Sequence, residues 1–394
     1  MRERGRFDAR ARWTPALVVA MTTSAVMVLA SAPPTAARLD AARSDTAPAV
    51  HWTLQTSGVT ARLRGVSAVS ETVAWASGTA GTIIRTTDGG RSWRRLTVPG
   101  TEALDFRDID AFDARVAYVL SIGPGAASRI YKTMDGGAHW DLQFQNQDER
   151  VFLDAMAFWT PSRGLAVSDS VDGRFVLFRT TDAGRTWTRI ADKSLPPALP
   201  GEGAFAASGT NVTVSGTRHA WIGTGAASEA RVLRTADGGD SWMVSPTPLP
   251  AGPSSGIFSI AFRDTRHGII VGGDYKQERA AVKNAATTID GGRTWTLTGT
   301  PGLSGFRSVV SYVPGSSAST AIAVGPSGAD RSVDDGRTWT PLESAGFHAF
   351  SLARRGGVGW AVGEEGRVAS VPDEKFADNT APRWRGFDRR SSSR

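Results

Sequence analysis

Cysteine is absent from this chain, and several other features that would define a function are scarce. With no Cys among 394 residues, the sequence has neither a disulfide scaffold nor a cysteine-ligated zinc site. The five His show no metal-ligand spacing, and no Ser–His–Asp set or phosphate-binding loop stands out. Outside the N-terminal region, no apolar run is long enough to span a bilayer, and no stretch has helical periodicity. These absences leave a globular β protein, in keeping with 40% hydrophobic and 21% charged residues.

The net charge of the chain is confined to its two ends. The formal charge of +7 would by itself favour a nucleic-acid partner. However, residues 1–37 hold five Arg against two acidic residues, and residues 383–394 hold five Arg against one Asp. The region between them is therefore neutral. A neutral body argues against a phosphate-binding surface, so we expect no nucleic-acid partner.

The N-terminus has the features of an export signal. A basic segment, MRERGRFDARARW, precedes the apolar stretch TPALVVAMTTSAVMVLA, which is short for a membrane span and interrupted by Thr and Ser. Small residues follow, and we expect cleavage near Ala32, Ala36 or Ala37. An uncleaved N-terminal anchor is the alternative. Both interpretations predict an exported protein, periplasmic or extracellular.

Glycine and tryptophan are abundant, with 44 Gly and 13 Trp, and they recur together in a nine-residue box. The first box is RTTDGGRSW, and it is followed by KTMDGGAHW, RTTDAGRTW, RTADGGDSW, TTIDGGRTW and RSVDDGRTW. The last Trp of successive boxes lie 47, 47, 55, 53 and 44 residues apart, which is the period of propeller blades. Each box closes a unit of four short β segments, in the first unit RGVSAV, ETVAWASG, GTIIRTT and SWRRLTV. Four-stranded units repeated about an axis predict an all-β propeller.

The two ends of the repeat predict seven blades, although there are six boxes. Residues 347–373 hold the first three strands of a seventh unit and a degenerate box, in which Asp373 is followed by no Gly or Trp at the right distance. At the other end, HWTLQTSG at 51–58 resembles the missing last strand, with Trp52 at the position of the box Trp. We therefore predict a seven-bladed β-propeller closed by its N-terminal strand. Such closure leaves no exposed sheet edge.

Each box combines an Asp, a Gly two residues later and a Trp three residues further on. The Asp carboxylate can accept hydrogen bonds from backbone N–H groups one or two residues ahead, the Gly supplies a backbone with positive φ, and the Trp folds its ring under the turn. One carboxylate per outer turn cannot converge on a metal ion, so we expect structural boxes and no metal. The box residues are Asp88, Gly90, Trp93, Asp135, Gly137, Trp140, Asp182, Gly184, Trp187, Asp237, Gly239, Trp242, Asp290, Gly292, Trp295, Asp334, Gly336 and Trp339.

The spacing S/T-x-D-x-G-x-x-W is identified as the Asp-box, or bacterial neuraminidase repeat. That motif occurs in sialidases, sortilin-type receptors, xyloglucanases and non-enzymatic propellers. The longer unit, with GTAGTIIRTTDGGRSW early and GWAVGEEGRVASV late, resembles the photosystem II assembly and stability factor family of chloroplasts and cyanobacteria, with its bacterial relatives. The resemblance covers roughly residues 50–373. It implies a seven-bladed, lumen-side, non-catalytic propeller that assists assembly of a membrane complex and needs no cofactor.

A glycoside hydrolase is the main alternative. A sialidase site would need an Arg triad, a Tyr paired with a Glu and an Asp. Of four Tyr, only Tyr275 has a nearby Glu, Glu278, in an expected inter-strand loop. A xyloglucanase-type site would need two Asp across a cleft, for which Asp108, Asp110 and Asp154 are candidates by type alone. Solvated turn carboxylates are the simpler interpretation, so we predict no catalytic residues.

One candidate site emerges when the first strands of the units are aligned. Innermost strands run along the central channel of a propeller, so equivalent positions should form a ring near one mouth. The ring would carry basic residues on neighbouring blades above an apolar floor, namely Arg64, Arg107, Arg307, His348 and Phe258, with Leu153 beside them. Arg forks above an apolar floor would recognise an anion or a carboxylate, and the family resemblance also implies an Arg-rich face toward a partner. The alternative is that each Arg pairs locally with Asp108, Asp110 or Asp154.

Together these observations predict an exported, non-catalytic binding scaffold for the assembly or stability of a membrane-associated complex. We expect a monomer with a protein partner. Glycan recognition and a sortilin-like ligand receptor, which would normally carry a transmembrane segment, are the alternatives. The expected organisation is a signal peptide at 1–37, a linker at 38–50, the propeller at 51–373 and a basic, disordered tail at 374–394.

Overall fold

The computed structural model describes residues 51–315, 319–354, 356–372 and 376. The expected signal peptide, the linker, Asp373 and all of the expected tail except Phe376 lie outside the described residues. Within the described part of the chain, no helix has the length and apolar character needed to cross a membrane.

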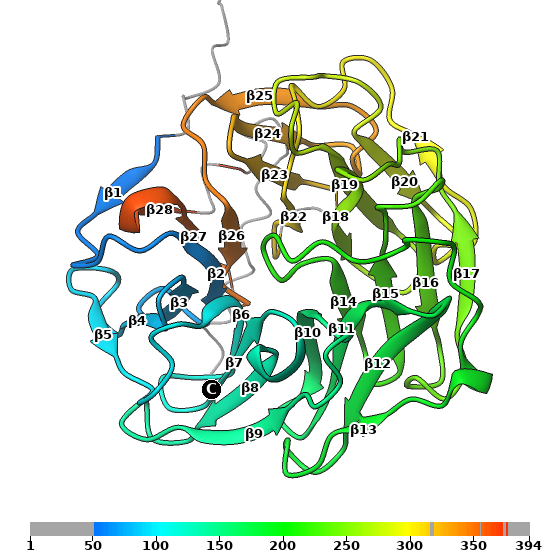
Figure 1. The fold of residues 1–394 in the computed structure, drawn as a ribbon. Helices are drawn as coiled ribbons and strands as arrows, with labels where there is room; N and C mark the ends of the chain where they lie inside the picture. Colours follow the sequence, from blue (N-terminus) through cyan, green and yellow to red (C-terminus); the bar gives the residue numbers. More distant parts are fainter. Residues whose placement is uncertain (1–50, 316–318, 355, 373–375, 377–394) are drawn as a thin grey trace, which may run out of the picture. The chain divides into compact units, whose positions relative to one another are not determined.

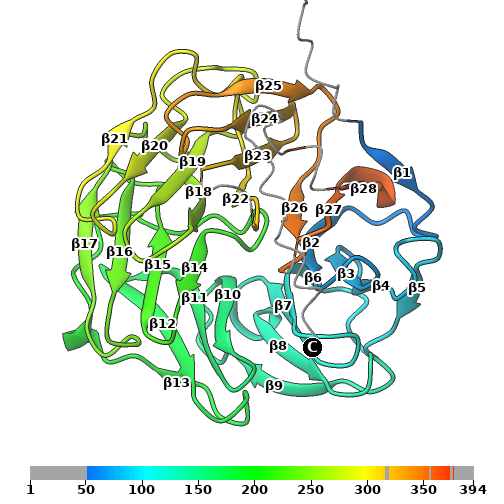
Figure 2. The same ribbon diagram turned by 180° about the vertical axis from the view of Figure 1, so that it is seen from behind.

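The described residues form seven four-stranded antiparallel sheets, arranged as blades around a centre (Figures 1 and 2). Blade one consists of β2 (Leu63–Ala68), β3 (Ala74–Gly78), β4 (Thr82–Thr86) and β5 (Arg94–Leu96); blade two of β6 (Asp105–Ala111), β7 (Ala117–Ile122), β8 (Arg129–Thr133) and β9 (Asp141–Gln145); blade three of β10 (Leu153–Thr160), β11 (Arg163–Val171), β12 (Arg174–Thr180) and β13 (Thr188–Arg189). Blade four consists of β14 (Val212–Ser215), β15 (His219–Gly223), β16 (Arg231–Thr235) and β17 (Met243–Pro246); blade five of β18 (Ser255–Phe262), β19 (Gly268–Asp274), β20 (Ala285–Thr288) and β21 (Thr296–Leu297); blade six of β22 (Val309–Tyr312), β23 (Ala321–Gly325), β24 (Gly328–Ser332) and β25 (Thr340–Glu343); blade seven of β26 (Ala349–Leu352), β27 (Val358–Val362), β28 (Val368–Pro372) and β1 (Thr53–Gln55). Three short 3₁₀ turns, η1 (Gly125–Ala127), η2 (Asp192–Ser194) and η3 (Glu364–Gly366), lie in the connections.

The core lies between the faces of neighbouring blades. β3 and β23 are buried along their whole length, because each is covered on both faces. Trp75 and Ile83 of blade one, for example, pack with Phe106 and Val119 of blade two in one apolar cluster. The outermost strands are short and largely exposed, as in β13. This burial pattern agrees with the strand sequences, since β3 and β23 are largely apolar and β13 is polar.

The N-terminal strand completes the seventh blade, as the sequence predicted. β1 pairs antiparallel with β28, with Leu54 opposite Ala369, and the two strands lie side by side in both ribbon views (Figures 1 and 2). The ring of Trp52 packs against Phe347 and Phe350 with centroids 5.1 and 5.7 Å apart. The last blade is therefore built from both ends of the propeller.

The box turns are held by a hydrogen-bond pattern wider than the sequence predicted. In the first box, Asp88 accepts hydrogen bonds from the N–H of Ser92 at 3.0 Å, from its hydroxyl at 2.6 Å and from the hydroxyl of Thr86 at 2.8 Å. The Thr86 hydroxyl also accepts from the N–H of Gly90 at 2.8 Å. The backbone N–H donor thus lies four residues after the Asp, whereas the sequence predicted a donor one or two residues after it. The residue before the Trp also donates a hydrogen bond to the carboxylate from its side chain. Hydrogen bonds from Ser92 and Thr86 hold the pKa of Asp88 at about 2.

The box Gly residues have the positive φ that the sequence predicted, whereas the burial of the box Trp rings varies from blade to blade. Each box Gly has a positive φ, from 78° at Gly336 to 92° at Gly239. Trp242 and Trp339 are buried, whereas the other four box Trp rings are only partly buried. The turn geometry is therefore constant around the ring, while the packing beneath it differs from blade to blade.

Candidate functional site

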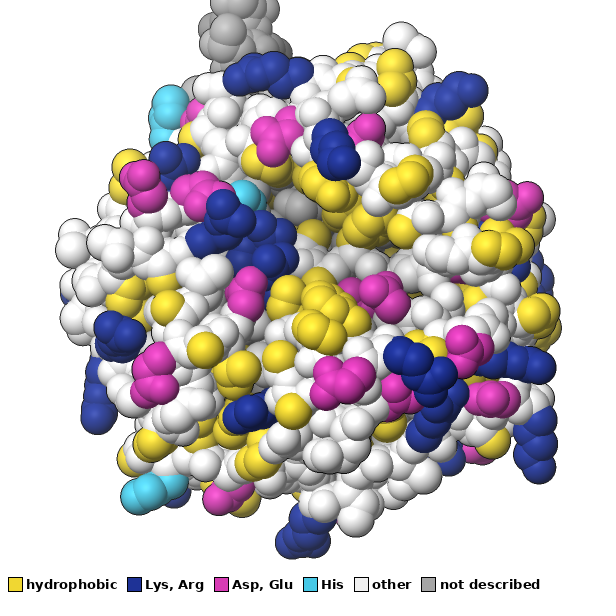
Figure 3. Space-filling view, in the orientation of Figure 1, with side chains coloured by type: hydrophobic (Ala, Val, Ile, Leu, Met, Phe, Trp, Pro, Cys, Tyr) yellow, Lys and Arg dark blue, Asp and Glu magenta, His cyan; other side chains and the backbone are white. Residues whose placement is uncertain are grey.

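The candidate site is a cavity of about 680 Å³ at the mouth where the innermost strands begin. Its lining comes from all seven blades and includes Arg64, Arg107, Phe258 and His348. Figure 3 shows Arg and Lys side chains gathered beside a central hollow, with hydrophobic side chains on the neighbouring part of its rim. Four of the five residues proposed from the sequence alignment thus line one cavity.

β-Bulges turn individual side chains into this cavity. The pairing of an innermost strand with its neighbour skips one residue in four blades, at Arg64, Arg107, Asp154 and Phe258. A bulge leaves one residue unpaired and redirects its side chain, and all four residues line the cavity. In blade three the bulged residue is Asp154. Leu153, which the alignment placed on the ring, is buried in the core instead.

Arg64 and Arg107 form the cationic side of the cavity. Arg107 pairs with Asp105 (Nε to Oδ2, 2.8 Å) and donates from Nη1 to the carbonyl of Ala206 at 2.6 Å. Arg64 donates from Nε to the carbonyl of Ala207 at 3.0 Å, and no carboxylate of the described residues lies within ion-pair distance of it. Burial, followed by the charge of Arg107, lowers the pKa of Arg64 to about 9. Neither Arg pairs with Asp108, Asp110 or Asp154. Arg107 is paired locally, but with Asp105, whereas Arg64 has no carboxylate partner among the described residues.

Arg307 does not lie at the mouth of the channel, where the sequence alignment placed it. Its side chain is fully buried and does not line the cavity. Nε donates to Oδ2 of Asp330 at 2.7 Å, and Nη2 donates to the hydroxyl of Ser304 at 2.5 Å. Because a buried carboxylate holds the guanidinium inside blade six, no donor of Arg307 is directed at a ligand. The cationic patch therefore consists of Arg64 and Arg107.

His348 lies at the edge of this patch. Its Nε2 is 2.7 Å from Oε1 of Glu364, which also accepts from Nε of Arg62. Burial and the charge of Arg64 lower the pKa of His348 below its ordinary value. His348 is therefore less basic than an exposed His. Arg62 also lines the cavity, but its charge is balanced by Glu364.

Residues 205–210 cross the channel and form the floor of the cavity. The carbonyls of Ala206 and Ala207 receive the hydrogen bonds from the two arginines of blades one and two. The hydroxyl of Ser208 donates to the carbonyl of Ser308 in blade six at 2.7 Å. Thr210 lines a separate cavity of about 360 Å³ among the far ends of the innermost strands. Among the described residues, the segment thus lies between the two cavities and contacts blades one, two and six.

The apolar wall of the cavity is aromatic. The ring of Phe205 stacks on Phe258 with centroids 4.0 Å apart and 9° between the planes. Tyr275 meets both rings edge-on at 6.4 and 6.1 Å. Tyr275 and Glu278 belong to the connection between β19 and β20, as the sequence predicted, and both line the cavity.

The three Asp residues that were candidates for a xyloglucanase-type site do not lie in solvated turns. Asp108 is buried on β6 and accepts a hydrogen bond from the N–H of Met156 at 2.7 Å. Asp110 pairs with Arg354 at 2.8 Å. Asp154 lines the cavity, together with Asp169 of β11, which the sequence analysis did not single out. Among the described residues, no group of three or more His, Cys, Asp or Glu is arranged to hold a metal ion.

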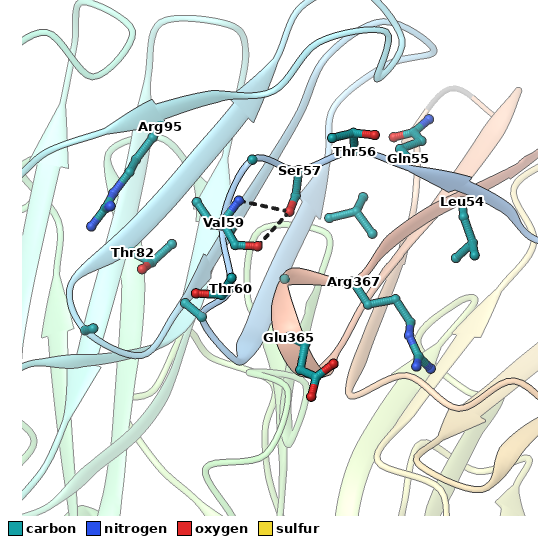
Figure 4. Close-up of a pocket in the computed structure, with 15 residues that line it drawn as sticks. Leu54, Gln55, Thr56, Ser57, Val59, Thr60, Thr82, Arg95, Glu365 and Arg367 are labelled. Atoms are coloured by element: carbon teal, nitrogen blue, oxygen red, sulfur yellow. Dashed lines mark hydrogen bonds between the residues drawn. The ribbon is translucent and has the colours of Figure 1, made fainter.

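A second groove, of about 800 Å³, follows the segment that leads from blade seven into blade one. The hydroxyl of Ser57 exchanges hydrogen bonds with the backbone of Val59 in its wall. Figure 4 shows Arg95 on the opposite side of the groove from Glu365 and Arg367. Because its charged groups do not converge, we favour the smaller channel cavity as the functional site.

Comparison with known proteins supports the family resemblance both in sequence and in fold. No family model matches the chain. A stretch of 125 residues is 33% identical to the photosystem II assembly lipoprotein Ycf48 of Synechococcus sp. (strain CC9902), covering 31% of this chain and 32% of that protein. The chain thus matches about a third of the length of this curated relative.

Three solved structures share the fold at low sequence identity. YCF48 bound to D1 peptide has a TM-score of 0.58 at 16% identity and covers 82% of this chain and 96% of its own. YCF48 from Cyanidioschyzon merolae has a TM-score of 0.58 at 15% identity, covering 82% and 99%. The GH74 xyloglucanase from Xanthomonas campestris has a TM-score of 0.55 at 17% identity, covering 83% of this chain and 54% of its own. The chain is a seven-bladed β-propeller that is similar to the photosystem II assembly factor Ycf48, as its repeat predicted.

Proposed function

We propose that this chain is an exported, non-catalytic binding propeller whose channel cavity holds a carboxylate-bearing segment of a protein partner. Through this contact it supports the assembly or stability of a membrane-associated complex. The observation that carries the proposal is the pair Arg64 and Arg107, which line one cavity and donate to the successive carbonyls of Ala207 and Ala206. Burial, followed by the charge of Arg107, lowers the pKa of Arg64, and a bound carboxylate would offset both effects.

The donors of Arg64 are suited to such a ligand. Only its Nε–H has a hydrogen-bond partner among the described residues, so both Nη groups remain to form a fork with a carboxylate. Burial strengthens the interaction, because the effective dielectric constant inside a cavity is low. The aromatic wall beside the arginines would take apolar side chains of the same segment.

The comparisons support a protein segment as the ligand. One of the structures that share this fold is YCF48 bound to D1 peptide, although at 16% identity the likeness itself concerns the fold alone. The export signal expected at residues 1–37 supports a partner outside the cytoplasm.

The test is affinity capture with the exported chain from detergent-solubilised membranes of its host, followed by mass spectrometry. The double variant Arg64→Gln/Arg107→Gln removes the patch. The control Arg94→Gln/Arg95→Gln removes the same charge from exposed positions on β5. We expect one membrane-complex subunit to be captured by the wild type and the control and lost with the first variant. Equal capture by all three proteins would overturn the proposal.

A sialidase-like hydrolase is the second candidate, because the cavity gathers the residue types such a site needs. These are Arg62, Arg64, Arg107, Tyr275, Glu278, Asp154 and Asp169. Against it, Arg62 is already paired with Glu364. Hydrolysis of a 4-methylumbelliferyl sialoside that is lost in Tyr275→Phe would establish this candidate. Retention on a glycan array without hydrolysis would instead favour carbohydrate binding.

A further inference from the structure

Two carboxylates without a cationic partner line the blade-three side of the cavity. Asp154 occupies the bulge of β10, and Asp169 lies on the neighbouring strand β11. Asp154 is only 1% exposed. Its Oδ2 has no hydrogen-bond partner among the described residues. A buried polar atom without a partner is uncommon and points to a missing one.

Two of the other buried acids have a cationic partner, since Glu202 pairs with Arg231 and Asp330 pairs with Arg307. Asp108 is also buried without an ion pair, but it accepts a hydrogen bond from the N–H of Met156 and does not line the cavity. No ion pair within the described part of the chain includes Asp154 or Asp169, and Asp169 accepts one hydrogen bond, from the N–H of Ala204 at 3.0 Å.

The electrostatic surroundings of the two groups agree with this geometry. Burial raises the pKa of Asp169 to about 6. Burial, followed by the charge of Asp169, raises the pKa of Asp154 well above its usual range. Both shifts reflect the cost of burying two neighbouring negative charges, which a cation between the two groups would offset.

We propose that Asp154 and Asp169 form a subsite for a primary ammonium or guanidinium group. The cavity would then accept a segment with a carboxylate at Arg64 and Arg107 and a cationic group at the two aspartates, as a Lys or Arg side chain beside a free carboxylate provides. The aliphatic stem of such a side chain would pack on Phe205 and Tyr275, which line the same cavity. The position of the carboxylate rests on the proposed function, whereas the ammonium subsite stands on its own geometry.

Two matched probes test the subsite. Nα-acetyl-lysine and Nα-acetyl-norleucine share the carboxylate and the blocked amine, and they differ in the terminal ammonium. Calorimetric titration of the full exported chain should show Nα-acetyl-lysine binding about tenfold or more tightly. Asp154→Asn and Asp169→Asn should each abolish this preference, because the amide keeps the shape and removes the charge. Asp172→Asn, at an exposed carboxylate of the same blade, should retain it.

The outcomes separate this inference from the proposed function. Equal binding of both probes, unchanged in the Asn variants, would overturn the ammonium subsite and leave the carboxylate site intact. If neither probe binds, the carboxylate site fails, and n-hexylammonium then tests the subsite alone. Binding of n-hexylammonium that is lost in both Asn variants would support the subsite, and no binding would overturn it.

Discussion

Arginines at aligned sequence positions have opposite environments in this propeller. Arg64 lies at a bulge and faces the cavity, whereas Arg307 precedes β22 and turns back to Asp330 of its own blade. The two differ in how the adjoining strand is paired, not in residue type. A fully buried ion pair stabilises the fold only while both partners are present, so Arg307 has a structural role.

Removal of Arg307 should therefore affect stability and not binding. We expect Arg307→Met to lower the free energy of unfolding by about 3–5 kcal/mol, because Asp330 is left buried and unpaired. Arg307→Met/Asp330→Leu should recover most of the loss. Urea unfolding of the three proteins measures this. A single variant that is as stable as the wild type but loses its partner would return Arg307 to the binding patch.

Asp169 should make stability depend on pH in the opposite sense to an ordinary ion-paired acid. Its folded-state pKa of about 6 lies above the ordinary value of 3.8. The facing groups are Asp154 on β10 and the N–H of Ala204. The raised pKa of Asp169 therefore contributes to the free energy of unfolding below about pH 4, where the carboxyl is protonated. This contribution, up to about 3 kcal/mol, is lost as the pH rises from 4 to 6.

The variant Asp169→Asn should remove this dependence. Relative to the wild type, it should gain stability between pH 4 and pH 7, as measured by urea unfolding at each pH. The exposed control Asp172→Asn should follow the wild type. Parallel profiles for Asp169→Asn and the wild type would show that Asp169 titrates normally.

At the scale of the element, the box turn is a unit that repeats in six blades and shares one hydrogen bond throughout. The box Ser or Thr hydroxyl accepts from the box Gly N–H in all six boxes, at 2.8 to 3.0 Å. What varies is the neighbour beneath each Gly. A methyl group on Gly336 would lie 2.7 Å from Cδ1 of Ile269, whereas one on Gly100, outside the boxes, would meet no atom within 4 Å.

These two glycines separate backbone strain from steric contact. Both have a left-handed backbone, with φ of 78° and 74°. We expect Gly100→Ala to lower the free energy of unfolding by about 1–2 kcal/mol. Gly336→Ala should cost clearly more, because Ile269 must also move. Chemical denaturation of both variants measures the two changes in the free energy of unfolding. Equal decreases would mean that Ile269 moves aside at no measurable cost.

At the scale of the whole molecule, one three-residue strand joins the two ends of the ring. Gln55 of β1 donates to the hydroxyl of Ser370 in blade seven at 2.9 Å. Its Oε1 accepts from Nε1 of Trp93, the box Trp of blade one, at 3.0 Å. β1 therefore completes blade seven and also connects it to blade one.

A proline in β1 should open the ring without altering the core. Leu54 is 68% exposed, so its side chain contributes little to packing, whereas a proline cannot donate to a strand ladder. We expect Leu54→Pro to lower stability by about 1–3 kcal/mol and to promote association through the uncovered edge of β28. Leu54→Ala is the control. Thermal unfolding and light scattering measure both effects, and identical behaviour of the two variants would show that closure does not depend on β1.

The amino-acid sequence by itself determined the architecture of this protein. The spacing of Asp, Gly and Trp in the boxes revealed the blades, and Trp52 with HWTLQTSG revealed how the last blade is closed. These features are local patterns repeated along the chain, so they can be recognised without knowledge of long-range contacts. The ring position of Arg64, Arg107, Phe258 and His348 followed from the same alignment.

The composition of the site was decided only by the tertiary structure. Asp154 and not Leu153 faces the cavity because the bulge of blade three lies one residue later than the alignment of the first strands placed it, and a sheet side chain changes face with each residue. Arg307 turns inward because its partner Asp330 lies two strands away in the folded blade, and Asp169 reaches Asp154 only across a strand pair. The floor at residues 205–210 carries no motif, because its place in the channel depends on contacts with blades that lie far from it in the sequence.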